Sequence, residues 1–259
     1  MKLSIAVLLS TAALATTAGA NTVIGLAGDK TLVKIDSETA QVTGMMEIEG
    51  VNRLHGLDYR PGNQTLIGVT DEQAVVTIDP ETGVATEISR MKTMLPVEDG
   101  AVVIVDVNPA ADKLRFMSGT TNHRVDMDNG DVTEDGSLNW TEGDENSEAP
   151  FMIGATGYSN SFGKPEATSM FNIDTGLSAL LQQTAPNDGT NATIGALGVM
   201  VEGPVGFDVA TDAEGNNAAW LAAMGGLHAV DLETGAVTDS WTIEGLDVEL
   251  RDITVWPAM

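Results

Sequence analysis

The chain contains no cysteine, which excludes disulfide bonds and a thiolate nucleophile. At 259 residues it is long enough to bury the apolar core that must hold it together without them. Basic residues are also scarce, because 12 lysines and arginines stand against 38 aspartates and glutamates, for a net charge of −26. Such a surface repels phosphates, which excludes nucleic acid as a partner and disfavours anionic membranes.

The common catalytic and cofactor-binding motifs are missing too. The sequence has no Gly-x-Ser-x-Gly elbow, no phosphate-binding loop and no dinucleotide fingerprint. Its three histidines, His55, His123 and His228, are too scattered for a zinc spacing. These absences favour a protein that is not an enzyme and predict no cofactor, although calcium is left open because oxygen ligands suit it.

A long apolar run occurs only at the N-terminus. Lys2 precedes an apolar run over residues 3–9, and a stretch of small residues ends at Ala20. A basic start, a short apolar stretch and a small-x-small ending are typical of a secretory signal peptide. We therefore expect residues 1–20 to be removed by cleavage near Ala20. The remaining chain, 21–259, is expected to be one domain without a membrane span, located in the periplasm or secreted.

One turn pattern recurs along the rest of the chain. Its copies begin at aspartates roughly 43 to 57 residues apart, at Asp36, Asp79, Asp126, Asp174 and Asp231. The best copies read Asp-x-Glu-Thr-Gly, a sequence typical of a hairpin turn, so we interpret the acids as turn formers. Ala40 replaces the glycine in the first copy, and the copy at Asp174 is shorter. Periods of this length on β-type sequence indicate a β-propeller.

Short alternating segments separate these turns, and no sustained helical period is present. Four strands fit each repeat, except that the first repeat lacks room for an inner strand. The last segment, 251–256, has no hairpin of its own. The sequence thus predicts an all-β, monomeric propeller of five four-stranded blades, in which this segment completes the first blade beside residues 23–26. Six blades is the alternative, because residues 149–183 are irregular.

Four segments form a further pattern. They are Gly25-Leu26 with Thr31 to Asp36, Gly56 to Pro61, Asn108 to Arg115, and Asn187 to Gly189 with Ile194 to Gly198. In this order they resemble the bacterial family known as the domain of unknown function DUF4394, over essentially the whole mature chain. The resemblance implies an exported, propeller-like β domain. It implies no activity and no site residues.

Three aspartates occupy equivalent places in the expected inner strands: Asp58, Asp106 and Asp208. A closed propeller would bring them around its axis, where carboxylates repel one another unless they are hydrogen-bonded or hold a cation. Because oxygen ligands suit calcium, they are candidate metal ligands and candidate ligand-binding residues. The interpretation we favour is that each caps backbone N–H groups inside its own blade, since a repeated residue is first a property of the repeat.

The few basic residues near the repeated turns are further ligand-binding candidates: Arg60, Arg115 and Arg251. In so acidic a chain we expect each of them to be held in an ion pair. A handful of polar groups around the mouth of a propeller is nevertheless the usual place for a ligand.

Two functions from different classes fit these observations. The first is an exported, non-enzymatic propeller that acts as a binding or interaction scaffold for a small molecule, a glycan or a protein. The second is a calcium-dependent hydrolase or lactonase that uses the inner-strand carboxylates. We favour the first, because the repeat is clean and no catalytic motif accompanies it. Fold alone does not decide between them, since propellers host both classes.

Overall fold

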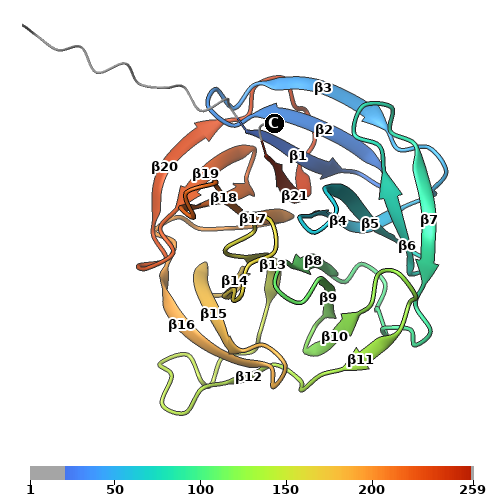
Figure 1. Cartoon of the computed structure of the whole chain (residues 1–259). Helices are drawn as coiled ribbons and strands as arrows, with labels where there is room; N and C mark the ends of the chain where they lie inside the picture. The colour runs from blue at the N-terminus through green and yellow to red at the C-terminus, as the bar shows by residue number, and fades with distance from the viewer. Residues whose placement is uncertain (1–20, 258–259) are drawn as a thin grey trace, which may run out of the picture.

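A computed structural model describes residues 21–257, and the expected signal peptide lies outside them. Within this range the chain forms twenty-one strands and no helix, and hence nothing helical that could span a bilayer. The strands form five sheets arranged around a central axis like the blades of a propeller (Figure 1). The five-bladed, all-β prediction is confirmed, and the six-blade alternative is wrong.

Each blade contains four antiparallel strands, which are named below from the inner strand outwards. Blade 1 has β21 (Leu250–Trp256), β1 (Thr22–Ala27), β2 (Thr31–Asp36) and β3 (Val42–Glu47). Blade 2 has β4 (Leu54–Arg60), β5 (Thr65–Thr70), β6 (Ala74–Ile78) and β7 (Ala85–Arg90). Blade 3 has β8 (Ile104–Asn108), β9 (Lys113–Ser118), β10 (Thr121–Val125) and β11 (Val132–Glu134).

Blades 4 and 5 complete the ring. Blade 4 has β13 (Ile153–Tyr158), β14 (Met170–Asp174), β15 (Ala179–Ala185) and β16 (Thr190–Ala196). A short strand, β12 (Asn139–Trp140), adds to it in parallel outside β16. Blade 5 has β17 (Val205–Thr211), β18 (Asn217–Ala223), β19 (Gly226–Val230) and β20 (Val237–Thr242).

The two ends of the described chain meet in blade 1. Strand β21 pairs with β1 in antiparallel register, with Val255 opposite Val23 and Ile253 opposite Gly25. It lies between the inner strands β17 and β4 of the neighbouring blades, which closes the ring (Figure 1). The predicted exchange of the C-terminal strand into the first blade is therefore confirmed, and β1 has no free edge.

The repeated aspartates form turns, as interpreted from the sequence. Asp36, Asp79 and Asp231 each accept, at Oδ1, the backbone N–H groups of the residues two and three positions later, at 2.7–3.1 Å. These donors favour the ionised carboxylate, and the pKa of each aspartate is lowered. Ala40 adopts φ 53°, the left-handed conformation that Gly83, Gly130 and Gly235 take in three other copies.

These turns also join neighbouring blades at the outer rim. The carbonyls of Gly83 and Gly130 accept the N–H groups of Glu49 and Lys92 from the preceding blade, each at 2.9 Å. The Ala40 carbonyl accepts the N–H of Glu244 in the same way. We call these segments the rim turns. Their residue at the left-handed position lies against the backbone of the preceding blade, so its lack of a large side chain has a structural cause.

The position of one repeat copy differs from the prediction. Asp174 ends β14 and leads into the turn to β15, the second and third strands of blade 4, whereas the rim turns join the third and fourth strands. The rim turn of blade 4 is instead residues 185–189, in which Ala185 replaces the leading aspartate. Its Gly189 has φ 73°, and its carbonyl accepts the N–H of Asn139 from the preceding segment. The error arises because Asp-Thr-Gly suits any hairpin turn.

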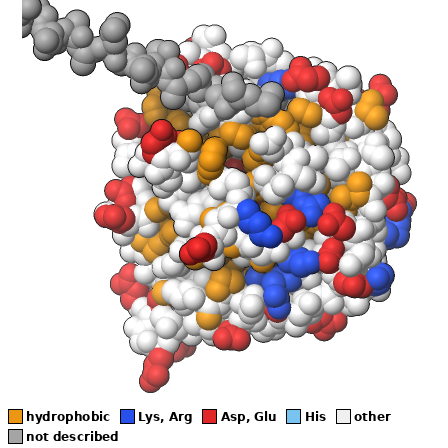
Figure 2. Space-filling view, viewed as in Figure 1, with side chains coloured by type: hydrophobic (Ala, Val, Ile, Leu, Met, Phe, Trp, Pro, Cys, Tyr) orange, Lys and Arg blue, Asp and Glu red, His pale blue; other side chains and the backbone are white. Residues whose placement is uncertain are grey.

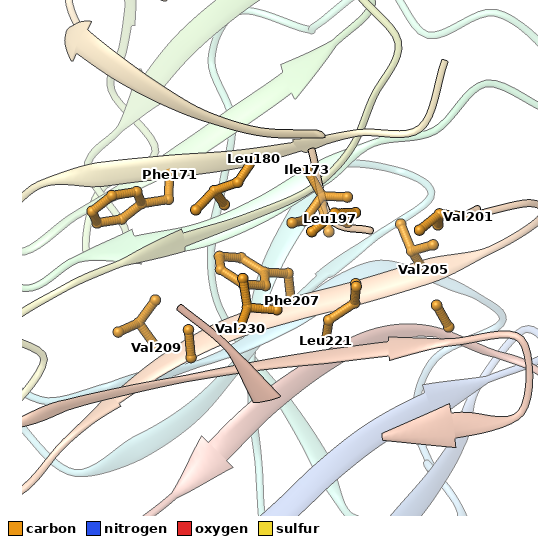
Figure 3. Close-up of a cluster of buried hydrophobic side chains, with 13 residues drawn as sticks. Phe171, Ile173, Leu180, Leu197, Val201, Val205, Phe207, Val209, Leu221 and Val230 are labelled. Atoms are coloured by element: carbon orange, nitrogen blue, oxygen red, sulfur yellow. The ribbon is translucent and has the colours of Figure 1, made fainter. Parts of the chain in front are cut away.

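The core lies between blades, where apolar side chains of facing sheets pack together. Figure 3 shows the cluster between blades 4 and 5, with Phe171 and Leu180 on one side and Phe207 and Leu221 on the other. Similar clusters fill the other interfaces, and the one between blades 3 and 4 is the smallest. A buried polar network around Arg115 occupies much of that interface instead.

Candidate functional site

The inner strands bring one equivalent residue from each blade to the same level near the axis. Asp58, Asp106 and Thr156 each lie two residues before the last cross-strand pair of their hairpin, opposite Ile67, Arg115 and Asn172. Their counterparts in the remaining blades are Asp208 on β17 and Thr254 on β21. We call these five residues the inner ring. It consists of three aspartates and two threonines.

The structure brings the three predicted aspartates together. One carboxylate oxygen from each of Asp58, Asp106 and Asp208 lies within 4.8 Å of the other two. All three side chains are buried, with residue exposures of 5%, 4% and 7%. Among the described residues they form the one group of acids and histidines close enough to hold a metal ion.

Asp58 and Asp208 are held by backbone donors from two blades each. Asp58 accepts the N–H of Tyr59 in its own strand at 2.7 Å and that of Val107 in the next blade at 2.6 Å. Asp208 accepts the N–H of Val209 and that of Val255 in the next blade, both at 2.6 Å. The expected capping of N–H groups thus occurs, but it crosses between blades as well as staying within them.

Asp106 differs from the other two aspartates. Within residues 21–257 no hydrogen bond reaches its carboxylate, although only 4% of the residue is exposed. Thr254, Asp58 and Asp208 each accept the N–H that follows the next inner-ring position. Asp106 breaks this pattern. A buried carboxylate without donors from the protein is costly, because no group of the chain replaces its lost solvation.

One hydroxyl is shared between the other two carboxylates. Thr254 Oγ1 lies 2.7 Å from Asp58 Oδ1 and 3.0 Å from Asp208 Oδ2, and it also accepts the N–H of Tyr59. A threonine hydroxyl has a single proton, so it can donate fully to only one of the two oxygens at a time. The cluster therefore has too few hydrogen-bond donors at Asp58 and Asp208 as well as at Asp106.

The electrostatics of the cluster follow from this shortage. Burial raises the pKa of Asp58 and Asp106 well above its usual range, and repulsion from the neighbouring carboxylates raises it further. Burial also raises the pKa of Asp208 to about 6. Asp252 lies on β21 two residues before Thr254 and is partly buried, and desolvation raises its pKa to about 8. Such a group can hold either protons or a cation at neutral pH.

A small cavity adjoins the cluster. Its walls include the three aspartates together with Tyr158 and Ser161. Ser161 belongs to the β13–β14 connection, which crosses to blade 5, where its hydroxyl donates to the Val209 carbonyl at 2.7 Å. The free volume is about 10 Å³, roughly that of one water-sized particle. A single ion or water fits at the carboxylates, whereas an organic substrate does not.

The candidate arginines lie outside the cluster. Arg60 is buried and makes paired hydrogen bonds to the carboxylates of Asp112 and Asp128, at 2.7–3.1 Å. Arg115 binds Asp135 at 2.8 Å. The expectation of ion pairs is correct for these two. Figure 2 shows basic side chains gathered near the middle of one face beside acidic ones.

Arg251 does not follow that expectation. Its guanidinium donates to the backbone carbonyls of His55 (2.7 Å) and Asp29 (3.1 Å), and also to those of Gly28 and Leu54. It therefore fixes the start of β21 against blades 1 and 2. Sequence reasoning missed this role because carbonyl acceptors carry no sequence signal.

The inner-ring threonines were also missed. Thr254 supplies the hydroxyl shared by two carboxylates, and Thr156 donates to the Asn172 side chain at 2.6 Å. A signal for Thr254 was present, because Asp252 to Val255 alternates polar and apolar residues like the aspartate-bearing inner strands. Thr156 has no such signal.

Five blades around a buried carboxylate cluster define a β-propeller with a closed acidic centre. The family model for the domain of unknown function DUF4394 matches residues 31–254, so the chain belongs to this family. No curated protein matches the chain.

Several solved structures are similar to this chain. A protein of unknown function from Bacteroides thetaiotaomicron VPI-5482 is 15% identical, with a TM-score of 0.53 over 93% of this chain and 66% of that one. A luciferin-regenerating enzyme is 14% identical, with a TM-score of 0.50 over 83% and 70%. An auxiliary nutrient binding protein from Bacteroides ovatus ATCC 8483 is 14% identical, with a TM-score of 0.48 over 83% and 57%. The chain spans only part of these proteins, and such likeness concerns the fold alone.

Proposed function

We propose that this protein is an exported, non-enzymatic propeller that acts as a scaffold for binding a small molecule, a glycan or a protein. The observation that carries the proposal is the size of the central cavity. With room for about one water-sized particle at the carboxylates, the central space is too small to enclose an organic ligand, so such a ligand would contact the outer surface of the blades.

The same geometry weighs against the hydrolase hypothesis. The carboxylate oxygens lie within 4.8 Å of one another, which argues against an inverting glycosidase, whose carboxyl groups are about 6.5–9.5 Å apart, but not against a retaining one, at about 5–5.5 Å. In addition, backbone N–H groups occupy both carboxylate oxygens of Asp58 and of Asp208. Carboxylates fixed in this way are poorly placed to transfer a proton to a substrate.

Hydrolysis assays test the proposal directly. With calcium present, we expect the mature protein to hydrolyse model lactones, esters and glycosides no faster than its Asp106→Asn variant, because no substrate reaches the cluster. Rates are measured by release of a chromogenic alcohol, with a hydrolase of each class as the positive control. Turnover by the natural protein that Asp106→Asn removes would reinstate the hydrolase hypothesis.

Export has its own test, which rests on the N-terminal sequence pattern. When the full gene product is expressed in a bacterium with a periplasm, we expect the soluble product outside the cytoplasm to begin near Asn21. N-terminal sequencing and intact mass give the cleavage point. A matched chain in which an arginine interrupts the apolar run at Val7 should stay uncleaved in the cytoplasm. Recovery of exported protein with Met1 retained would show that the signal-peptide interpretation is wrong.

A further inference from the structure

We propose that Asp58, Asp106 and Asp208 form a calcium site at the centre of the ring, which holds blades 2, 3 and 5 together. The site is distinct from any surface on which a larger ligand binds, so this inference does not depend on the proposed scaffold function. It rests on geometry: three buried carboxylates, a cavity of ionic size and one carboxylate without a partner.

The hydrogen bonds leave free acceptor positions on each aspartate. A carboxylate oxygen can accept about two donors. Asp58 Oδ2 and Asp208 Oδ1 each accept only one N–H, so each has a lone pair left for a cation. Both oxygens of Asp106 are unoccupied by any donor in the described chain. The three side chains therefore offer at least three oxygen ligands without breaking an existing hydrogen bond.

Within residues 21–257, no basic side chain forms an ion pair with the cluster, although the charge of Arg115 lowers the pKa of Asp106 against the larger effect of burial. Arg115 lies opposite Asp106 in the sheet, which makes it the expected partner. Its guanidinium points elsewhere, however, and donates to Asp135, Asn122 and the Tyr158 hydroxyl at 2.7–3.2 Å. A buried trio of acids without a cation is unfavourable, since desolvation and mutual repulsion both oppose its ionised form. A bound divalent ion removes both costs.

The ligand chemistry selects calcium among the common divalent ions. All of the ligand atoms in the cluster are carboxylate oxygens, which suit hard cations rather than zinc or copper. Magnesium requires a near-ideal octahedron at short distances, and Asp58 and Asp208, which are held by backbone hydrogen bonds, are not free to build one. Calcium loses its water more readily and tolerates irregular coordination by mono- or bidentate carboxylates.

The proposed site would act as a central clamp. Its ligands come from β4, β8 and β17, and the hydroxyl of Thr254 on β21 links two of them. Four of the five inner strands therefore contribute to it or support it. Because the aspartates reach their positions only when the ring is closed, the ion binds the folded state and stabilises it by mass action.

The test compares the natural protein with Asp106→Asn, both stripped by a chelator and then titrated with calcium. For the natural protein we expect binding of one calcium per chain by isothermal titration calorimetry, and a rise in melting temperature of roughly 5–10 °C at a hundredfold excess over Kd. In Asp106→Asn we expect affinity at least about tenfold weaker and most of the thermal shift lost.

Asp106 is well suited to this experiment because its replacement breaks no hydrogen bond of the described chain. Stripped of metal, Asp106→Asn should melt at or above the temperature of the stripped natural protein, since one buried charge is gone. Asp106→Thr introduces the residue type of Thr156, the inner-ring residue of blade 4, and replaces Asp106→Asn in the experiment if the asparagine variant folds poorly. The matched control is Asp247→Asn, which removes one charge from an exposed side chain and should leave calcium binding unchanged.

Three results would overturn the proposal. One is the absence of stoichiometric calcium binding to the stripped natural protein. Another is an equal calcium response in the natural protein, Asp106→Asn and Asp247→Asn, which would mean diffuse attraction to an acidic surface. The third is tighter binding of magnesium or zinc than of calcium, which would refute the choice of ion.

Discussion

Deletion of residues 250–259 is expected to abolish folding into a soluble monomer. This change removes β21, which supplies the inner strand of blade 1 and packs between β17 and β4. It also removes buried Ile253 and Val255 from the core and exposes the whole edge of β1. The free energy lost with a strand and its core contacts should exceed the total free energy of unfolding of a domain, about 5–15 kcal/mol.

Circular dichroism and size-exclusion chromatography measure this effect. The matched control deletes only residues 257–259, which follow the last cross-strand pair, Trp256 with Thr22, and should leave the melting temperature unchanged. The longer deletion should instead produce aggregated or unfolded protein, because an open sheet edge pairs readily with other chains. A longer deletion with natural melting temperature and monomeric elution would refute the role assigned to β21.

The second large effect is expected at the rim turn of blade 3. Gly130 has φ +76°, and a Cβ added there would lie within van der Waals overlap of the Arg90 carbonyl oxygen in blade 2. Gly130→Ala therefore places an alanine in the left-handed conformation and brings its Cβ into a clash with the Arg90 carbonyl. Neither backbone segment can move away without opening the interface between the blades. We expect a loss of roughly 2–5 kcal/mol in the free energy of unfolding.

Gly119→Ala is the control for this substitution. Gly119 also has positive φ, +56°, but an added Cβ would meet no atom within 4 Å. Its cost should be the conformational strain alone, about 1–2 kcal/mol. Urea denaturation gives both values, and the difference between them isolates the clash. Equal midpoints for the two variants would show that the rim contact does not constrain the position.

The blade number and ring closure could be predicted from sequence because both depend on local signals repeated many times. Asp-x-Glu-Thr-Gly forms a turn wherever it occurs, and a final strand without a hairpin needs a partner elsewhere. Blade 4 was misassigned because its rim turn lost the leading aspartate at Ala185, while Asp174 forms a similar turn one strand earlier. The period alone could not distinguish the two positions.

The convergence of the aspartates was predictable for the same reason, since equivalent residues in a closed ring surround one axis. What sequence could not supply is the partner of each carboxylate. The N–H groups of Val107 and Val255 come from neighbouring blades, and backbone donors are the same for every residue type. The lack of a hydrogen-bond donor to Asp106 likewise depends on how β8 and β13 face each other, which only the folded ring determines.

The place of β21 has a consequence for biosynthesis. A ribosome makes residues 250–256 after every other strand of the ring, so a growing chain carries blade 1 without its inner strand until the last moment. Thr254 on β21 links Asp58 and Asp208, so this link forms only when the last strand docks. The two carboxylates are thus joined in the same step that shuts the ring, and a chain cut short in translation never forms this link.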